Sequence, residues 1–87
     1  MNAPVPHSTA ARVVLYSRAG CHLCAVARDV VADVCAQVGA EWVEVDIDSD
    51  DRLVTAFTEQ VPVTFVDGRQ HDFWRVEPQR LRAALAR

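Results

Sequence analysis

The chain has 87 residues, of which 51% are hydrophobic, and it carries a formal net charge of −3 with arginine as its only strongly basic residue. This length predicts one domain with a single core. The mild charge and the absence of a basic stripe argue against a nucleic-acid partner, and no apolar run is long enough to span a membrane.

The first eleven residues differ from the rest in composition. Residues 1–11 contain prolines and small polar residues but neither the basic start nor the apolar core of a secretory signal. We therefore predict a flexible leader at 1–11, a folded domain at 12–87 and a cytoplasmic location. The bias toward alanine, valine and arginine is typical of a GC-rich bacterial genome. In the cytoplasm, a Cys-x-x-Cys pair indicates redox or metal chemistry rather than a structural bridge.

Apolar spacing in the first half predicts a strand, a turn and a long helix. Residues 12–17 form a short apolar run typical of a buried central strand, and residues 18–20 supply the turn. Apolar residues then recur at helical spacing over 22–38, and Gly39 stands where a helix commonly ends.

Two cysteines, Cys21 and Cys24, open this helix one turn apart. A helix N-terminus favours the thiolate form of a cysteine, because the positive end of the helix dipole lies there. The thiolate attacks disulfides, and a second sulfur three residues later resolves the mixed disulfide. The motif therefore predicts a thiol–disulfide redox site.

The second half completes an alternating order of strands and helices. We predict a half-buried strand at 41–47, N-cap candidates at 48–50, a helix at 51–59, a strand at 61–66, a hairpin turn at Asp67-Gly68, a returning strand at 70–76 and a last helix starting at Glu77-Pro78. The order β-α-β-α-β-β-α predicts an α/β fold, a four-stranded mixed sheet with helices on both faces. The cysteine turn then lies at the carboxyl edge of a central strand.

These elements and motifs resemble the glutaredoxin-like branch of the thioredoxin superfamily. The matching residues are Val14-Leu15-Tyr16-Ser17-Arg18-x-x-Cys21-x-x-Cys24 and Val61-Pro62-Val63-x-Phe65-x-Asp67-Gly68. The resemblance implies a thioredoxin-like fold, with Cys21 as nucleophile and Cys24 as resolving cysteine. It also implies a cis Val61–Pro62 peptide beside the nucleophile, with the backbone N–H and C=O of Val61 unpaired and open to an incoming peptide or thiol.

Three further residues enter the predicted substrate site. His22 follows the nucleophile and, when protonated, would stabilise the thiolate; it is equally compatible with an exposed helix start. Arg18 matches a basic residue of the family and would steady a thiolate or meet a ligand carboxylate; the alternative is a solvated turn residue. Trp74 follows the hairpin, where a contact with substrate and simple packing are both open.

The region that binds glutathione in the family differs here. Members that use glutathione carry Gly-Gly and then an acidic residue after the hairpin, whereas this chain has Asp72-Phe73 and Arg75. Side chains replace bare amides and a cation replaces the acid, which argues against glutathione in its usual pose. We expect a low-molecular-weight thiol, for which mycothiol is a candidate, or a thioredoxin-type reductase to supply electrons.

The sequence thus favours a small, monomeric thiol–disulfide oxidoreductase that needs no bound cofactor or metal and acts on a disulfide-containing protein or a small-thiol substrate. An iron–sulfur or metal-binding relative is one alternative, although one Cys-x-x-Cys supplies only two ligands. A non-enzymatic binding module that uses Val61 or Trp74 is the other. Cys35 lies ~16 Å along the helix from Cys24 and is predicted to be a buried apolar residue.

Overall fold

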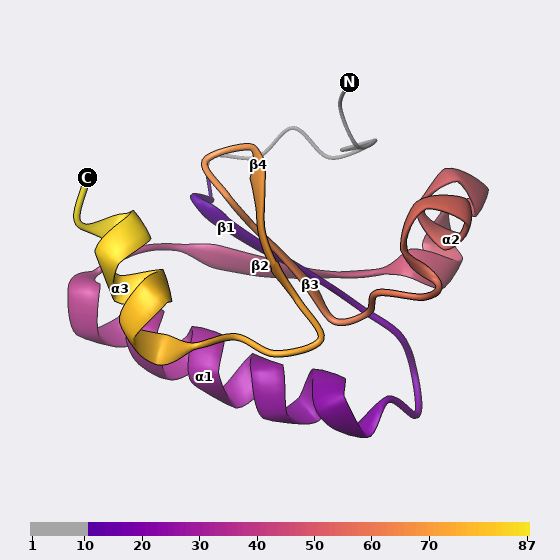
Figure 1. Ribbon diagram of the computed structural model, residues 1–87, viewed down its shortest axis with the longest axis horizontal. Helices are drawn as coiled ribbons and strands as arrows, with labels where there is room; N and C mark the ends of the chain where they lie inside the picture. Colours follow the sequence, from indigo (N-terminus) through magenta and orange to yellow (C-terminus); the bar gives the residue numbers. More distant parts are fainter. Residues whose placement is uncertain (1–10) are drawn as a thin grey trace.

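A computed structural model describes residues 11–87, so all but the last residue of the predicted leader lies outside the described part. Strand β1 (Val13–Ser17) pairs in parallel with β2 (Trp42–Asp46) and antiparallel with β3 (Val63–Val66), which pairs antiparallel with β4 (Arg69–Phe73). The sheet order is β2-β1-β3-β4 (Figure 1). The predicted four-stranded mixed sheet is confirmed.

Helices cover both faces of this sheet, as Figure 1 shows. Helices α1 (His22–Val38) and α3 (Pro78–Leu85) pack on one face, and α2 (Asp51–Phe57) packs on the other. Side chains alternate along a strand, so Val13 and Leu15 of β1 join the α1–α3 core, whereas Val14 and Tyr16 join the α2 core. All five residues of β1 are buried, as a central strand requires.

The element bounds follow the predictions most closely where glycine or aspartate marks an end. Helix α1 covers the predicted residues and ends at Gly39, whose φ of 74° places it in the left-handed region. Asp50 accepts a hydrogen bond from the amide of Arg52 and thereby caps α2. A short 3₁₀ turn, η1 (Ile47–Ser49), takes Ile47 out of the predicted strand. Helix α2 ends two residues earlier than predicted.

The β3–β4 hairpin turns at Asp67 and Gly68, which have φ values of 52° and 82°. Positive φ at both central residues suits the twist of a two-residue hairpin, as predicted.

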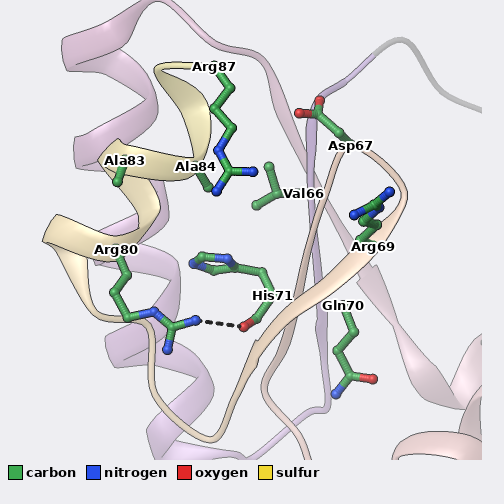
Figure 2. A pocket seen from close by; sticks show the side chains of 9 residues that line it. All are labelled: Val66, Asp67, Arg69, Gln70, His71, Arg80, Ala83, Ala84 and Arg87. Atoms are coloured by element: carbon green, nitrogen blue, oxygen red, sulfur yellow. Dashed lines mark hydrogen bonds between the residues drawn. The ribbon is translucent and has the colours of Figure 1, made fainter.

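The ladder between β3 and β4 contains a bulge. Thr64 pairs with Asp72 and Phe65 with Gln70, which leaves His71 as the extra residue of this bulge. Its imidazole points toward α3 (Figure 2), and Arg80 donates a hydrogen bond to its carbonyl oxygen at 3.4 Å. His71 and Arg80 line a pocket between the hairpin and α3 (Figure 2), and none of the predicted site residues lines it.

Candidate redox site

The turn between β1 and α1 holds the two cysteines. Gly20 has a φ of 75°, which a glycine adopts at little cost, and the amide of Cys21 donates to the carbonyl oxygen of Arg18 at 3.3 Å. Cys21 is the N-cap residue of α1, with extended backbone angles, and its Sγ accepts a hydrogen bond from the amide of Cys24 at 3.1 Å. No acidic residue lies in the first turn of α1. The sulfur of Cys21 thus occupies the electropositive end of the helix.

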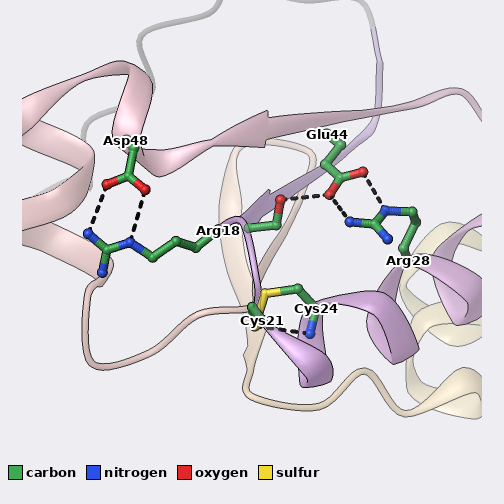
Figure 3. The surroundings of a disulfide bond; sticks show 7 residues. Arg18, Cys21, Cys24, Arg28, Glu44 and Asp48 are labelled. Carbon is green, nitrogen blue, oxygen red and sulfur yellow. Dashed lines mark hydrogen bonds and ion pairs between the residues drawn. A yellow bond between two sulfur atoms is a disulfide. The ribbon is translucent and has the colours of Figure 1, made fainter.

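The two cysteines differ in their exposure to solvent. They form a disulfide, with Cα atoms 5.2 Å apart (Figure 3). Cys24 is completely buried, whereas Cys21 is partly exposed. An external sulfur can therefore approach Cys21 but not Cys24. The third cysteine, Cys35, is buried, as predicted, and burial raises the pKa of its thiol, which keeps it protonated.

The Val61–Pro62 peptide bond is cis, and the ring of Pro62 is buried. The prediction that both backbone groups of Val61 are unpaired is wrong for the N–H group. That N–H donates to the carbonyl oxygen of Phe57 at 3.0 Å, because the chain continues the last turn of α2 before it enters β3. The docking prediction for Val61 is therefore left with its carbonyl oxygen alone.

Trp74 lies outside the returning strand, which ends at Phe73 rather than at residue 76 as predicted. Its φ of 66° turns the backbone away from the sheet. Its amide donates to the carbonyl oxygens of Pro62 at 2.8 Å and Gln60 at 3.2 Å, and its indole N–H donates to that of Glu59 at 3.0 Å. Trp74 therefore holds the end of the hairpin against the segment that contains Pro62.

His22 and Trp74 line the same open groove, of about 290 Å³, which lies between α1 and the segment after β4. Arg18 is placed differently. Its guanidinium donates two hydrogen bonds to Asp48, at 2.8 and 3.0 Å, and Figure 3 shows it extending away from the disulfide. This contact lowers the pKa of Asp48. It also pairs the positive charge of Arg18 with a carboxylate of the protein itself, and not with the thiolate or ligand that the sequence analysis considered.

One polar cluster near the disulfide escaped the sequence analysis. Arg28 of α1 donates two hydrogen bonds of 2.7 Å to Glu44 of β2, and the Ser17 hydroxyl donates to the same carboxylate at 2.6 Å (Figure 3). The Arg28 guanidinium holds the pKa of Glu44 below its usual value, opposed by partial burial and aided by Ser17. These residues are far apart in sequence, and only the polar alternation of β2 hinted at an outward-facing Glu44.

Within residues 11–87, histidine, cysteine and acidic side chains form no group of three or more that could hold a metal. Over the same residues, no helix combines the length and apolar character needed to cross a bilayer.

The comparisons with known proteins agree with this geometry. The glutaredoxin-like domain family (DUF836) matches residues 12–86. An uncharacterized protein of Mycobacterium tuberculosis is 33% identical over 81 residues, covering 87% of this chain and 84% of its own length. The solution structure of a structural genomics target from X. campestris is 37% identical, with a TM-score of 0.69 and coverage of 86% of this chain and 92% of that chain.

A glutaredoxin from wheat is more distant. Its crystal structure is 25% identical, with a TM-score of 0.51 and coverage of 75% of this chain and 64% of that chain. The fold, the turn that carries the Cys21–Cys24 pair and the match over residues 12–86 all lead to one assignment. This chain belongs to the glutaredoxin-like family.

Proposed function

We propose that the protein is a small thiol–disulfide oxidoreductase in which Cys21 is the nucleophile and Cys24 the resolving cysteine. The observation that carries the proposal is the position of the Cys21 sulfur, which caps α1 and accepts the Cys24 amide at 3.1 Å. A hydrogen bond to sulfur and a helix N-terminus both stabilise a thiolate. The difference in exposure supports the same assignment, because only Cys21 faces solvent.

The reaction uses two electrons from the reduced cysteine pair. The Cys21 thiolate attacks one sulfur of the substrate disulfide, forms a mixed disulfide and releases the other substrate sulfur as a thiolate, which takes up a proton. Cys24 then loses its proton and attacks the Cys21 sulfur. This second step releases the remaining substrate thiol and leaves the Cys21–Cys24 disulfide. The substrate gains two electrons and two protons, which the cysteine pair has lost.

The surroundings of the pair would orient the substrate. The Val61 carbonyl oxygen and Pro62 would form a docking edge, and Trp74 and His22 would contact the bound group. Arg18 would take part only as the ion pair that it forms with Asp48. A low-molecular-weight thiol or a thioredoxin-type reductase would return electrons to the pair in the cytoplasm. Glutathione in its usual pose is disfavoured, since Asp72, Phe73 and Arg75 replace the usual glutathione cradle, and mycothiol is one candidate for the small thiol.

The proposal is tested by single substitutions of the three cysteines. Reduction of bis(2-hydroxyethyl) disulfide by the wild type should fall to the uncatalysed rate in Cys21→Ser. Cys24→Ser should instead accumulate a mixed disulfide with the substrate, detectable by mass spectrometry, because the first step survives. Cys35→Ala is the matched control and should keep the activity, since Cys35 is buried elsewhere on α1. Equal rates for wild type and Cys21→Ser would refute the proposal.

A further inference from the structure

Most of the large exposed apolar side chains among residues 11–87 lie at the end of the molecule that carries the cysteines. Within the described part of the chain, the exposed large hydrophobic residues are Leu23 (43%), Val26 (51%), Val38 (45%), Phe73 (47%) and Trp74 (53%), of which Val38 lies at the far end of α1. Three of them line one groove, here called the Trp74 groove and defined by His22, Leu23, Val26, Trp74, Arg75 and Val76. Phe73 packs its ring against Trp74, with centroids 5.1 Å apart. Single exposed apolar residues are ordinary, but a contiguous group marks an interaction surface.

The Trp74 groove adjoins the turn that carries the redox pair, although neither cysteine lines it. It begins at His22 and Leu23, the two residues between the cysteines, and runs along α1 to Val26. A polypeptide whose sulfur reaches Cys21 can therefore place neighbouring side chains over this groove. A small thiol has no side chains that extend so far along α1.

The aromatic wall of the groove is fixed before any partner arrives. Backbone and indole N–H groups of Trp74 are all bonded to carbonyl oxygens of the segment from Glu59 to Pro62. The ring is held in place while about half of the residue stays exposed. A rigid, exposed tryptophan loses little conformational freedom on binding, and tryptophan is enriched among residues that dominate binding energies.

The charges that line the groove indicate the chemistry of the occupant. His22 and Arg75 are its polar residues, and no acidic residue is among those that line it. The chain as a whole is acidic, with a formal charge of −3, so this local balance differs from that of the molecule. Arg18 is held by Asp48 and does not add to it. An occupant with a carboxylate near its apolar side chains complements Arg75.

We propose that the Trp74 groove docks a polypeptide disulfide, with large apolar residues next to the cysteine and an acidic residue beyond them. The proposal rests on the proposed oxidoreductase function and names its preferred substrate class, which is protein disulfides ahead of disulfides of small thiols. The apolar residues contact Leu23, Val26 and Trp74 while the acidic residue meets Arg75. Cys21 then exchanges with the substrate sulfur as described above.

Rates with three disulfide probes test this substrate class. The probes are the symmetric disulfides of acetyl-Glu-Leu-Phe-Cys-amide and acetyl-Glu-Ser-Asn-Cys-amide, together with bis(2-hydroxyethyl) disulfide. The wild type should reduce the apolar peptide about tenfold faster than either the polar peptide or bis(2-hydroxyethyl) disulfide, the effect expected from burying part of one large side chain. Equal rates for the two peptides would overturn the docking proposal and leave the oxidoreductase function standing.

Two matched variants of α1 locate the preference. Val26→Asp should reduce the ratio of the two peptide rates to about threefold or less, because it removes apolar surface from the groove. Val38→Asp, at the opposite end of the same helix, should leave the ratio unchanged. A ratio that survives Val26→Asp would also overturn the proposal.

A binding measurement with peptides that contain serine in place of cysteine tests docking separately from the oxidoreductase function. The chain has two tryptophans, so Trp42→Phe leaves Trp74 as the single indole reporter. Titration of this variant with acetyl-Glu-Leu-Phe-Ser-amide should change its fluorescence, whereas acetyl-Glu-Ser-Asn-Ser-amide should change it at much higher concentration. If the protein reduces no disulfide but the apolar peptide still changes the fluorescence, docking is supported and the oxidoreductase function is refuted. No difference between the two peptides would refute docking.

Discussion

The hydroxyl group of Tyr16 lies in the apolar core between α2 and the sheet. The side chain is fully buried, and its ring packs against those of Phe57 and Phe65 at centroid distances of 5.1 and 5.4 Å. Among residues 11–87 the hydroxyl has no hydrogen-bond partner, and burial raises its pKa. A buried polar group without a partner reduces stability, because it gives up its bonds to water.

Tyr16→Phe is therefore expected to keep or increase the stability of the protein. The free energy of unfolding should stay constant or rise by up to about 1 kcal/mol, since the substitution removes the unpaired oxygen and keeps the ring. Urea denaturation followed by circular dichroism measures the change. Thr64→Val tests the same effect on the opposite face of the sheet, where another buried hydroxyl lacks a partner. A large loss of stability in Tyr16→Phe would mean that the hydroxyl is hydrogen-bonded.

Gly39 ends α1 in a conformation that other residues adopt at a cost. Its φ is 74°, and a Cβ added there meets no atom within 4 Å. The effect of Gly39→Ala is thus purely conformational, and we expect it to lower the free energy of unfolding by about 1 kcal/mol. Gly39→Asn should cost less, because asparagine tolerates the left-handed region better. Equal effects of the two substitutions in thermal denaturation would contradict this explanation.

At the scale of elements, three secondary-structure elements beside the redox turn are joined by the cluster of Ser17, Arg28 and Glu44. It connects the end of β1, the second turn of α1 and the edge strand β2. Because the Arg28 contact lowers the pKa of Glu44, the folded chain favours the charged form of Glu44 more than the unfolded chain does. The stabilisation is present above the ordinary pKa of glutamate and is lost as the pH falls through the lower folded value.

Glu44→Gln should therefore destabilise the protein in a pH-dependent way. At neutral pH we expect a loss of about 1 kcal/mol, since the pair is bidentate but partly exposed. The difference from wild type should disappear in acid, where Glu44 of the wild type is protonated. Urea denaturation at a series of pH values measures it, with the exposed neighbour Glu41→Gln as the matched control. A difference that is constant over pH would show that the charge of Glu44 is not the cause.

Local signals explain which elements the sequence predicted well. The apolar stripe and Gly39 placed both ends of α1, and Asp67-Gly68 placed the hairpin, because these signals lie within the element itself. The end of β4 was missed because Trp74 leaves the strand to bond carbonyl groups of a different segment. The paired N–H of Val61 was missed because its partner is the carbonyl oxygen of Phe57 at the end of α2. In both cases the deciding partner lies outside the local pattern.

The candidate site divides in the same way. Cys21 and Cys24 are neighbours in sequence, so their motif located the turn and the cap. The partners of Arg18 and Glu44 come from elements that the fold alone brings close, and sequence spacing contains no sign of them. An arginine near a nucleophile is therefore a weak signal until its acidic partners are known.

At the scale of the whole molecule, Arg12 joins three segments that are far apart in sequence. Its guanidinium donates two hydrogen bonds to Asp67 in the hairpin turn, at 2.8 and 2.9 Å. It also donates to the carbonyl oxygen of Leu85, at 2.9 Å, and to that of Arg87, at 3.5 Å. The same side chain thus connects the start of β1, the β3–β4 turn and the C-terminal end of α3, where carbonyl groups lack partners within the helix.

Arg12→Met should lower the midpoint of thermal unfolding, because methionine keeps the apolar stem of the side chain and removes all of these hydrogen bonds. Arg52→Met is the matched control. Arg52 is also paired with an aspartate, but Asp50 lies only two residues away and the pair joins no separate segments. Hydrogen exchange should locate the effect of Arg12→Met in α3 and the hairpin, where protection falls, while α2 stays protected. Equal midpoints for the two variants would show that the long-range connections of Arg12 add nothing to the stability of the fold.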